Sequence, residues 1–270
     1  MREKRKQLFC GSKKIIYCAL FLIAFLIVFS STYNPFNFKQ MYGDSAVYIT
    51  IAQGITKGQV PYRDFVDNKG PLTYLISAPG LFLGGFTGVW ITELIVIFIS
   101  VLFAYKTALF FADRRNAFLA TFFCCLVLLS FFYVNAGTEE YSLPFLMISF
   151  FIFSKYYFSE KEIRFYELVI LGACFACAIM TRLNAFPLWA GFCVAILVET
   201  LYKRKYSALF RYISGFCLGV FVILLPVFLY LKVNDILNDF YVQVIAGGTA
   251  RGFSAPGIKE ISNYYFEVMS

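Results

Sequence analysis

The residues best suited to chemistry cluster between positions 34 and 71. Asp44 follows a glycine and precedes an apolar run with helical spacing, and Asp67 and Lys69 lie further on, beside Arg63. Cations bind phosphate through charge-assisted hydrogen bonds, and a carboxylate can take a proton or a metal ion. This pattern indicates an anion site in which Arg63 and Lys69 hold a phosphate.

Two plainer interpretations of the same residues stay open. Asp44 or Ser45 can cap the helix that follows. Arg63, Asp64, Asp67 and Lys69 can form a solvated turn held by a local ion pair beside prolines and glycines.

A second acidic group, Glu139 and Glu140, stands in a very short polar segment between two apolar runs. Two carboxylates at the mouth of a helical bundle must be solvated, paired or used. One interpretation is that they suit the start of the next helix. The other places one of them opposite Asp44 in a shared cavity, as an acceptor-binding or metal-binding group.

The elements that position these residues are apolar helices. Of the 270 residues, 60% are hydrophobic and 15% are charged, which is far from the balance of a soluble domain. The composition therefore predicts an all-α, polytopic transmembrane bundle of about seven spans, with amphipathic helices in the first outer loop. The expected spans are 15–33, 89–111, 117–134, 141–158, 167–181, 185–201 and 209–231.

The distribution of basic residues predicts the orientation. The expected cytoplasmic segments carry 15 of the 24 Lys and Arg residues, which places the N-terminus in the cytoplasm. The chain then divides into a basic tail (1–14), a transmembrane module (15–231) with an outer loop at 34–88, and an outer-face segment (232–270). Because the positive charge lies between apolar runs, no nucleic-acid partner is expected.

An apolar stretch at 72–87 does not fit a simple span. It is short, and Pro79-Gly80 and Gly84-Gly85 interrupt it. We expect an interfacial helix or a re-entrant piece that leads into the second span.

Three segments then resemble a known family. Gly43-Asp44, Pro61-Tyr62-Arg63-Asp64 and Asp67-Asn68-Lys69-Gly70-Pro71-Leu72 resemble the first outer loop of bacterial GT-C glycosyltransferases, which are similar to protein O-mannosyltransferases and lipid A aminoarabinose transferases. Residues 137–144 resemble the acidic second outer loop of that family. Residues 234–240 resemble the segment after the seventh helix.

The resemblance implies an inverting transferase that moves a hexosyl or pentosyl group from a polyprenyl-phosphate sugar, at the outer face of the plasma membrane. Asp44 would be the catalytic base, and Lys69, Arg63 and Arg182 would bind the donor phosphate. Glu139, Glu140 and Asp67 would bind the acceptor or a divalent metal ion. The acceptor would be a cell-envelope glycan, lipid or protein.

Several alternatives accompany that expectation. Asn68 stands where relatives often carry an acidic residue or histidine, which argues against a borrowed metal site. Arg182 can instead reach lipid headgroups, and Glu93, inside a span, can have a structural role. Arg251 lies in the outer-face segment and can approach the donor.

Two other functions stay open. Seven helices are compatible with a transporter or lipid flippase, although neither an internal repeat nor a matched pair of broken helices is visible. Because relatives of the resembled family continue beyond the seventh helix, the chain can also be a non-catalytic fragment of a larger glycosyltransferase.

Overall fold

The computed structural model describes residues 2–36, 43–131, 135–159 and 162–247, and these are helical with no β-strand among them. The all-helical prediction is therefore confirmed. The elements are α1 (Arg2–Phe29), α2 (Asp44–Thr56), α3 (Leu72–Ala108), α4 (Arg114–Phe131), α5 (Thr138–Ser159), α6 (Phe165–Thr181), a 3-10 turn (Leu183–Ala185), α7 (Pro187–Tyr202), α8 (Tyr206–Val233), α9 (Leu237–Phe240) and a π-helical turn (Tyr241–Ala246).

A helix lies at each of the seven positions expected from the apolar runs. Within the described residues, three stretches are long and apolar enough to cross a membrane, namely Leu72–Ala108, Leu183–Tyr202 and Tyr206–Val233. The apolar helices Lys14–Phe29 and Phe165–Thr181 are shorter. The first helix ends at Phe29 rather than at residue 33, because the chain turns at Ser30 and Ser31.

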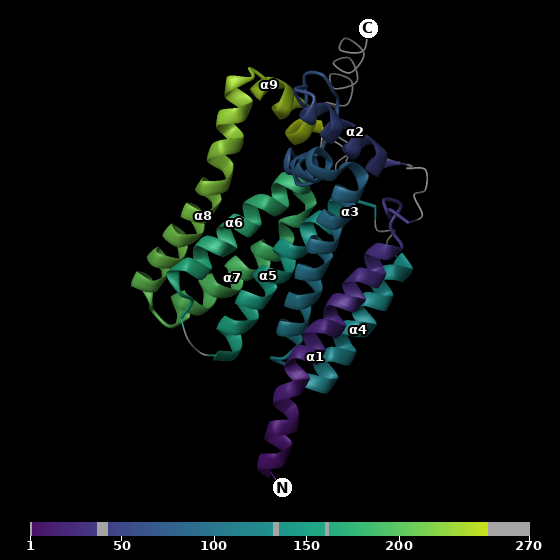
Figure 1. The fold of residues 1–270 in the computed structure, drawn as a ribbon. Coiled ribbons are helices and arrows are strands. Elements are labelled where there is room, and N and C mark those ends of the chain that lie inside the picture. Colours follow the sequence, from purple (N-terminus) through teal and green to yellow (C-terminus); the bar gives the residue numbers. More distant parts are fainter. Residues whose placement is uncertain (1, 37–42, 132–134, 160–161, 248–270) are drawn as a thin grey trace.

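The helices run side by side in two groups (Figure 1). One group places α1 and α4 against α3, and the other places α6 between α5 and α8. Glycines allow the close approach of α6 and α8. A Cβ atom added at Gly172 or Gly219 would lie 2.0 Å from a backbone carbonyl oxygen of the facing helix. Small residues at such crossings let two helix backbones touch.

The α3 helix is broken at Gly84 and Gly85, whose backbone angles are not helical. The chain turns sharply there, because Gly80 and Gly88 contact each other through their backbones although a straight helix would hold them about 12 Å apart. Gly85 has a positive φ of 58°, which glycine adopts without strain. The break lies where the sequence predicted an interruption, and it separates residues 72–83 from the long helix that follows.

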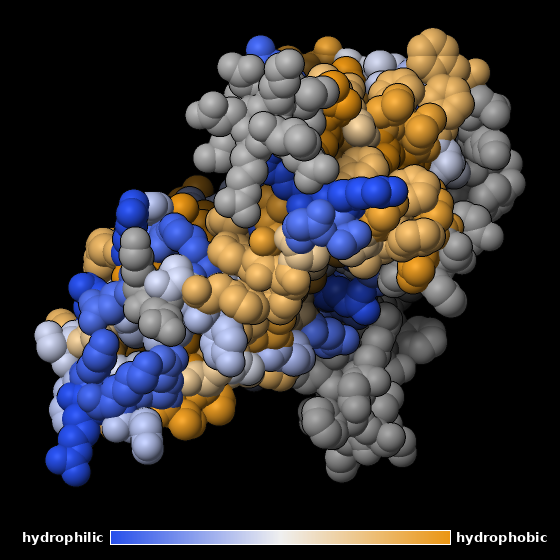
Figure 2. Space-filling view, turned by 90° about the horizontal axis from the view of Figure 1, so that it is seen from below, coloured by the Kyte–Doolittle hydropathy of each residue, from blue (hydrophilic) through white to orange (hydrophobic). Residues whose placement is uncertain are grey.

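Much of the outer surface is apolar, as expected for helices surrounded by lipid. Seen from below, hydrophilic residues gather on the side where the lower ends of α7 and α8 lie, next to wide hydrophobic areas (Figure 2).

One end of the bundle is covered by α2, the loop that follows it, α9 and the π-helical turn (Figure 1). These segments share a small core in which Tyr48, Tyr62 and Tyr74 pack with Leu231 and Val244. α2 contributes one buried face to this core and leaves Val47 and Thr50 exposed. The cover is therefore an ordered part of the fold, and it contains most of the residues that the sequence singled out.

Candidate functional site

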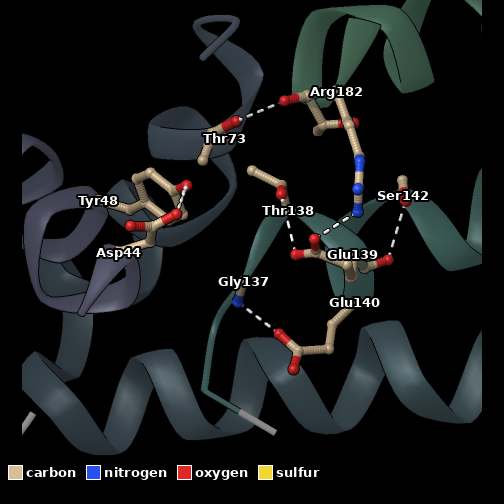
Figure 3. A network of polar contacts seen from close by, with 10 residues as sticks. Asp44, Tyr48, Thr73, Gly137, Thr138, Glu139, Glu140, Ser142 and Arg182 are labelled. Carbon is tan, nitrogen blue, oxygen red and sulfur yellow. Dashed lines mark hydrogen bonds and ion pairs between the residues drawn. The ribbon is translucent and has the colours of Figure 1, made fainter. Parts of the chain in front are cut away.

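A polar cavity of about 160 Å³ lies under this cover, where α2 and the loop before α3 meet the first turn of α5 and the end of α6. Figure 3 shows Asp44 and Tyr48 on one side and Thr138, Glu139 and Arg182 on the other. The cavity is lined by Asp44, Asn68, Lys69, Gly70, Thr138, Glu139, Thr181, Arg182, Leu183 and Asn184. We call it the outer pocket.

Asp44 enters the outer pocket from the first turn of α2. The residue before the helix is Gly43, which has a positive φ of 67°, and no side chain caps the helix. The sequence allowed Asp44 to cap this helix, but in the structure Asp44 does not cap it. The Tyr48 hydroxyl donates a hydrogen bond of 3.2 Å to Asp44 Oδ2. Burial and the nearby Asp44 raise the pKa of Tyr48, so this hydroxyl keeps its proton and remains a donor.

Lys69 lies in the loop before α3, half-buried in the pocket wall. Tyr62 donates a 2.7 Å hydrogen bond to the Lys69 carbonyl. The next residue, Gly70, packs on the end of α6, where an added Cβ would lie 2.1 Å from the Met180 carbonyl oxygen. Thr73 Oγ1 donates a 3.1 Å hydrogen bond to the Thr181 carbonyl. These contacts hold Lys69 beside the end of α6.

Glu139 and Arg182 form an ion pair in which Arg182 Nη1 donates to Glu139 Oε1. Thr138 Oγ1 donates to the other carboxylate oxygen at 3.0 Å. The two side chains are about 40% exposed (Arg182 39%, Glu139 44%), so solvent or a ligand reaches both. This pair joins the start of α5 to the end of α6.

Three residues that the sequence placed with these lie outside the outer pocket. Arg63 is more than half exposed and pairs with Asp64 at 3.3 Å, which is the local ion pair of the plainer interpretation. The hydrogen bond from the Val60 N–H, with the neighbouring Arg63, lowers the pKa of Asp64. Asp67 accepts a 2.7 Å hydrogen bond from the Tyr74 hydroxyl, and burial raises the pKa of Asp67.

Glu140 points away from the pocket, opposite to its neighbour Glu139 (Figure 3). Its carboxylate accepts hydrogen bonds from the N–H groups of Gly137 and Asn135 and is 5% exposed. It therefore closes the turn that begins α5. Arg251 lies outside the described residues.

Several residues of the site were not singled out from the sequence. Tyr48 and Thr138 support or line the outer pocket. Gln243 is fully buried and bridges two loop positions, accepting from the Asp67 N–H and donating to the Tyr62 carbonyl at 2.7 Å. Its only signal in the sequence is its place as a lone polar residue in the run YVQVIA.

The pocket brings two cations and two carboxylates together. Glu139 is committed to Arg182, whereas no described carboxylate lies within ion-pair distance of Lys69. A pocket with one uncommitted cation is suited to an anionic ligand. No group of three or more His, Cys, Asp or Glu among the described residues is placed to hold a metal ion.

A family model described as "Putative competence-induced protein Ccs4 N-terminal domain" matches residues 4–247. The chain belongs to this family. No curated protein and no solved structure matches the chain significantly.

The match to the Ccs4 N-terminal domain family contains every residue that lines the outer pocket. It also contains Gln243 and the π-helical turn that follows α9. The outer pocket therefore lies entirely within the region that matches the family model.

Proposed function

We propose that the chain is a multi-pass plasma-membrane glycosyltransferase that transfers a sugar from a polyprenyl-phosphate donor to an acceptor at the outer face. The observation that carries this proposal is the convergence of Asp44, Lys69, Glu139 and Arg182 on one cavity. These four side chains come from four segments that are distant in the sequence. Charged groups placed together at a bundle end are suited to phosphate chemistry.

The proposed topology has seven spans and a cytoplasmic N-terminus. It is supported by helices at the seven expected positions, three of them long and apolar enough to span, and by the basic residues near the far ends of α7 and α8. The outer pocket lies at the opposite end of α5 and α6 from those basic residues. In this topology the pocket opens on the outer face, where a lipid-carried donor is the available form of an activated sugar.

The proposed reaction is a single displacement with inversion at the sugar. Asp44 takes the proton of an acceptor hydroxyl, and the oxygen attacks the anomeric carbon. The bond from that carbon to the phosphate oxygen breaks, and the polyprenyl phosphate leaves with the bonding electrons. Lys69 and Arg182 stabilise the charge that develops on the leaving phosphate.

The remaining predicted residues support this site from outside the cavity. Asp67 and Glu140 fix the loops that carry Lys69 and Glu139, and Arg63 has no direct part in the proposal. Glu139 holds Arg182 in the absence of a ligand and faces the space open to an acceptor.

A membrane assay with a radiolabelled polyprenyl-phosphate sugar tests the proposal. Asp44→Asn removes the base, and transfer should fall by about 10²–10⁴-fold at normal expression. Asp64→Asn is the matched control, because Asp64 is an exposed acid in the loop that follows α2 and lies outside the pocket. Full transfer by the Asp44→Asn protein would refute the role of Asp44.

The alternative of a transporter or flippase is distinguished in liposomes. Uptake or lipid scrambling by the wild-type protein, without any transfer product, would favour that function. Labelling of a cysteine at position 44 from outside the cell tests the topology on which the proposal depends. A position reachable only from the cytoplasm would rule the proposal out.

A further inference from the structure

A second polar cluster is buried next to the outer pocket, between the end of α1, the middle of α3 and the start of α5. It contains Glu93 on α3, Glu140 on α5 and Tyr33 just after α1. Their exposed fractions are 1%, 5% and 0%, respectively. Around them lies a hydrophobic core that includes Val89 and Trp90. Acidic groups so deeply buried need an explanation.

The hydrogen bonds of the cluster leave two oxygen atoms without a partner. Ser31 Oγ donates to Glu93 Oε2 at 2.7 Å, the Ala136 N–H also interacts with the Glu93 carboxylate, and the two oxygens of Glu140 accept from backbone N–H groups. Within the described part of the chain, Glu93 Oε1 and the Tyr33 hydroxyl oxygen have no hydrogen-bond partner. Leaving such buried atoms unsatisfied costs about 1–3 kcal/mol each.

The charge of the cluster is also unbalanced. No described Lys or Arg forms an ion pair with Glu93 or Glu140. The two carboxylates lie close enough to act electrostatically on each other and on both Tyr33 and Tyr141. Buried carboxylates without a counter-charge are strongly unfavourable. The cluster therefore lacks a positive charge, and two of its oxygen atoms lack a partner.

We propose that Glu93, Glu140 and Tyr33 bind a sodium ion. Like a proton, a sodium ion offsets one of the two carboxylate charges. Unlike a proton, it also supplies a coordination partner for Glu93 Oε1 and the Tyr33 oxygen, the two atoms that lack one. Every side-chain ligand is a hard oxygen, which excludes soft metal ions. Two carboxylates are few for Ca²⁺, which takes six to eight oxygen ligands and often several carboxylates.

The position of this site suggests what the ion does for the fold. Thr32 donates a 2.9 Å hydrogen bond to the Asn135 side chain, so the end of α1 already contacts the turn before α5. The ion would add a second connection through Glu140, next to Glu139 of the outer pocket. It would therefore stabilise the turn that positions Glu139, whether or not the protein transfers sugar.

Thermal unfolding of the full chain in detergent tests the proposal. The buffers contain NaCl, KCl or N-methyl-D-glucamine chloride, and in separate runs CaCl₂ or MgCl₂, at one ionic strength, and tryptophan fluorescence is the signal. Trp90 lies one turn from Glu93 and donates to the Val28 carbonyl, so its emission reports on this junction. Sodium should raise the Tm in a saturable way. An equal Tm in all three salts, or a shift given only by Ca²⁺ or Mg²⁺, would overturn the proposal.

Variants locate the effect. Glu93→Gln should abolish the sodium-dependent shift, and Tyr33→Phe should raise the half-saturating sodium concentration about tenfold. If Glu93→Gln does not fold, the sodium dependence of the Tm of Tyr33→Phe tests the site by itself. Glu199→Gln is the matched control that keeps the shift, because Glu199 lies at the end of α7 in the far cavity of the bundle. A sodium shift that survives in both Glu93→Gln and Tyr33→Phe would place the ion elsewhere and reject the site.

Discussion

The two ends of the bundle each carry a charged cavity, and the two cavities differ in how their charges are matched. The cavity at the far end of α5 and α7 is larger, at about 430 Å³ against about 160 Å³ for the outer pocket. At the far end, Lys203 pairs with Glu199 at 2.6 Å and Lys205 pairs with Glu162 at 3.8 Å. In the outer pocket, Lys69 has no such partner among the described carboxylates.

The origin of the charges differs as well. The far-end pair Glu199–Lys203 lies within one helical turn at the end of α7, as is common for solvated helix ends. The outer pocket assembles side chains from segments far apart in the sequence. Two of the far-end cations are thus paired, one locally and one with Glu162 from a distant segment, whereas Lys69 in the outer pocket, which pairs with no described carboxylate, is free to bind an anionic ligand. In the part of the chain that the structure describes, each cavity has two cations and two carboxylates, so the pairing of these charges, rather than their balance or the volume, identifies the site.

The sharpest way to break this comparison is to remove one lysine from each end. Lys69→Ala should reduce transfer about 10²–10³-fold, because it removes the uncommitted cation that stabilises the leaving phosphate. Lys203→Ala should leave transfer within about twofold and cost about 0–1 kcal/mol of stability. The measurement is transfer from a polyprenyl-phosphate sugar in membranes. Equal losses in the two variants would contradict the assignment of the site to the outer pocket.

The packing that holds Lys69 offers a second test. Gly70→Ala places a Cβ against the Met180 carbonyl, and we expect a loss of about 1–3 kcal/mol in the free energy of unfolding. Gly191→Ala in α7 is the control, because an added Cβ there meets open space. Thermal unfolding in detergent should show a lower Tm only for the first variant. An unchanged Tm for Gly70→Ala would show that the loop tolerates displacement from α6.

A smaller effect should follow from releasing Arg182. Glu139→Gln removes the carboxylate that competes with an anionic ligand, so binding of inorganic phosphate should tighten about two- to fivefold, the equivalent of an exposed ion pair. Glu199→Gln at the far end should leave phosphate binding unchanged. Calorimetric titration of both variants measures the difference. Weaker binding by the Glu139→Gln protein would mean that Glu139 helps to hold the ligand.

The smallest expected effect concerns pH. Because burial raises the pKa of Asp67, the folded protein holds this proton more tightly than the unfolded chain does. Protonated Asp67 therefore contributes to the free energy of unfolding at low pH. This contribution is lost as the pH rises from the usual pKa of an aspartate through the raised pKa of Asp67. Asp64, with a lowered pKa, acts in the opposite sense.

Thermal unfolding across acidic pH separates the two acids. Asp67→Asn should reduce the loss of stability on raising the pH, and Asp64→Asn should reduce the loss on lowering it. If both substitutions changed the slope of Tm against pH in the same direction, the opposite pKa shifts of Asp67 and Asp64 would be contradicted.

The helical fold was largely predictable, because apolar runs of spanning length have few other solutions. The sequence also indicated the break at Gly84 and Gly85, since paired glycines rarely continue a helix. The ends of the helices were less predictable. α1 stops at Phe29 because Ser31 turns to bond Glu93, a contact between residues 62 positions apart.

Charged residues of the candidate site were recognisable because charge is rare in this chain. Their roles were not separable by sequence alone. Glu139 and Glu140 are neighbours of the same type, and only the contacts of Gly137 and Asn135 turn one away from the pocket. Gln243 was missed because its partners, Tyr62 and Asp67, lie almost the whole chain away.

The buried amide of Gln243 has a consequence for biosynthesis. The Tyr62 backbone has a positive φ of 69°, an unfavourable conformation for an aromatic residue, and the amide bonds its carbonyl from 181 positions downstream. The loop that carries Lys69 therefore gains this support only after α8 and the turn beyond it have emerged from the ribosome. The cavity therefore matures only after residues beyond α8 have been synthesised, and a nascent chain arrested before Gln243 would expose the loop to proteases.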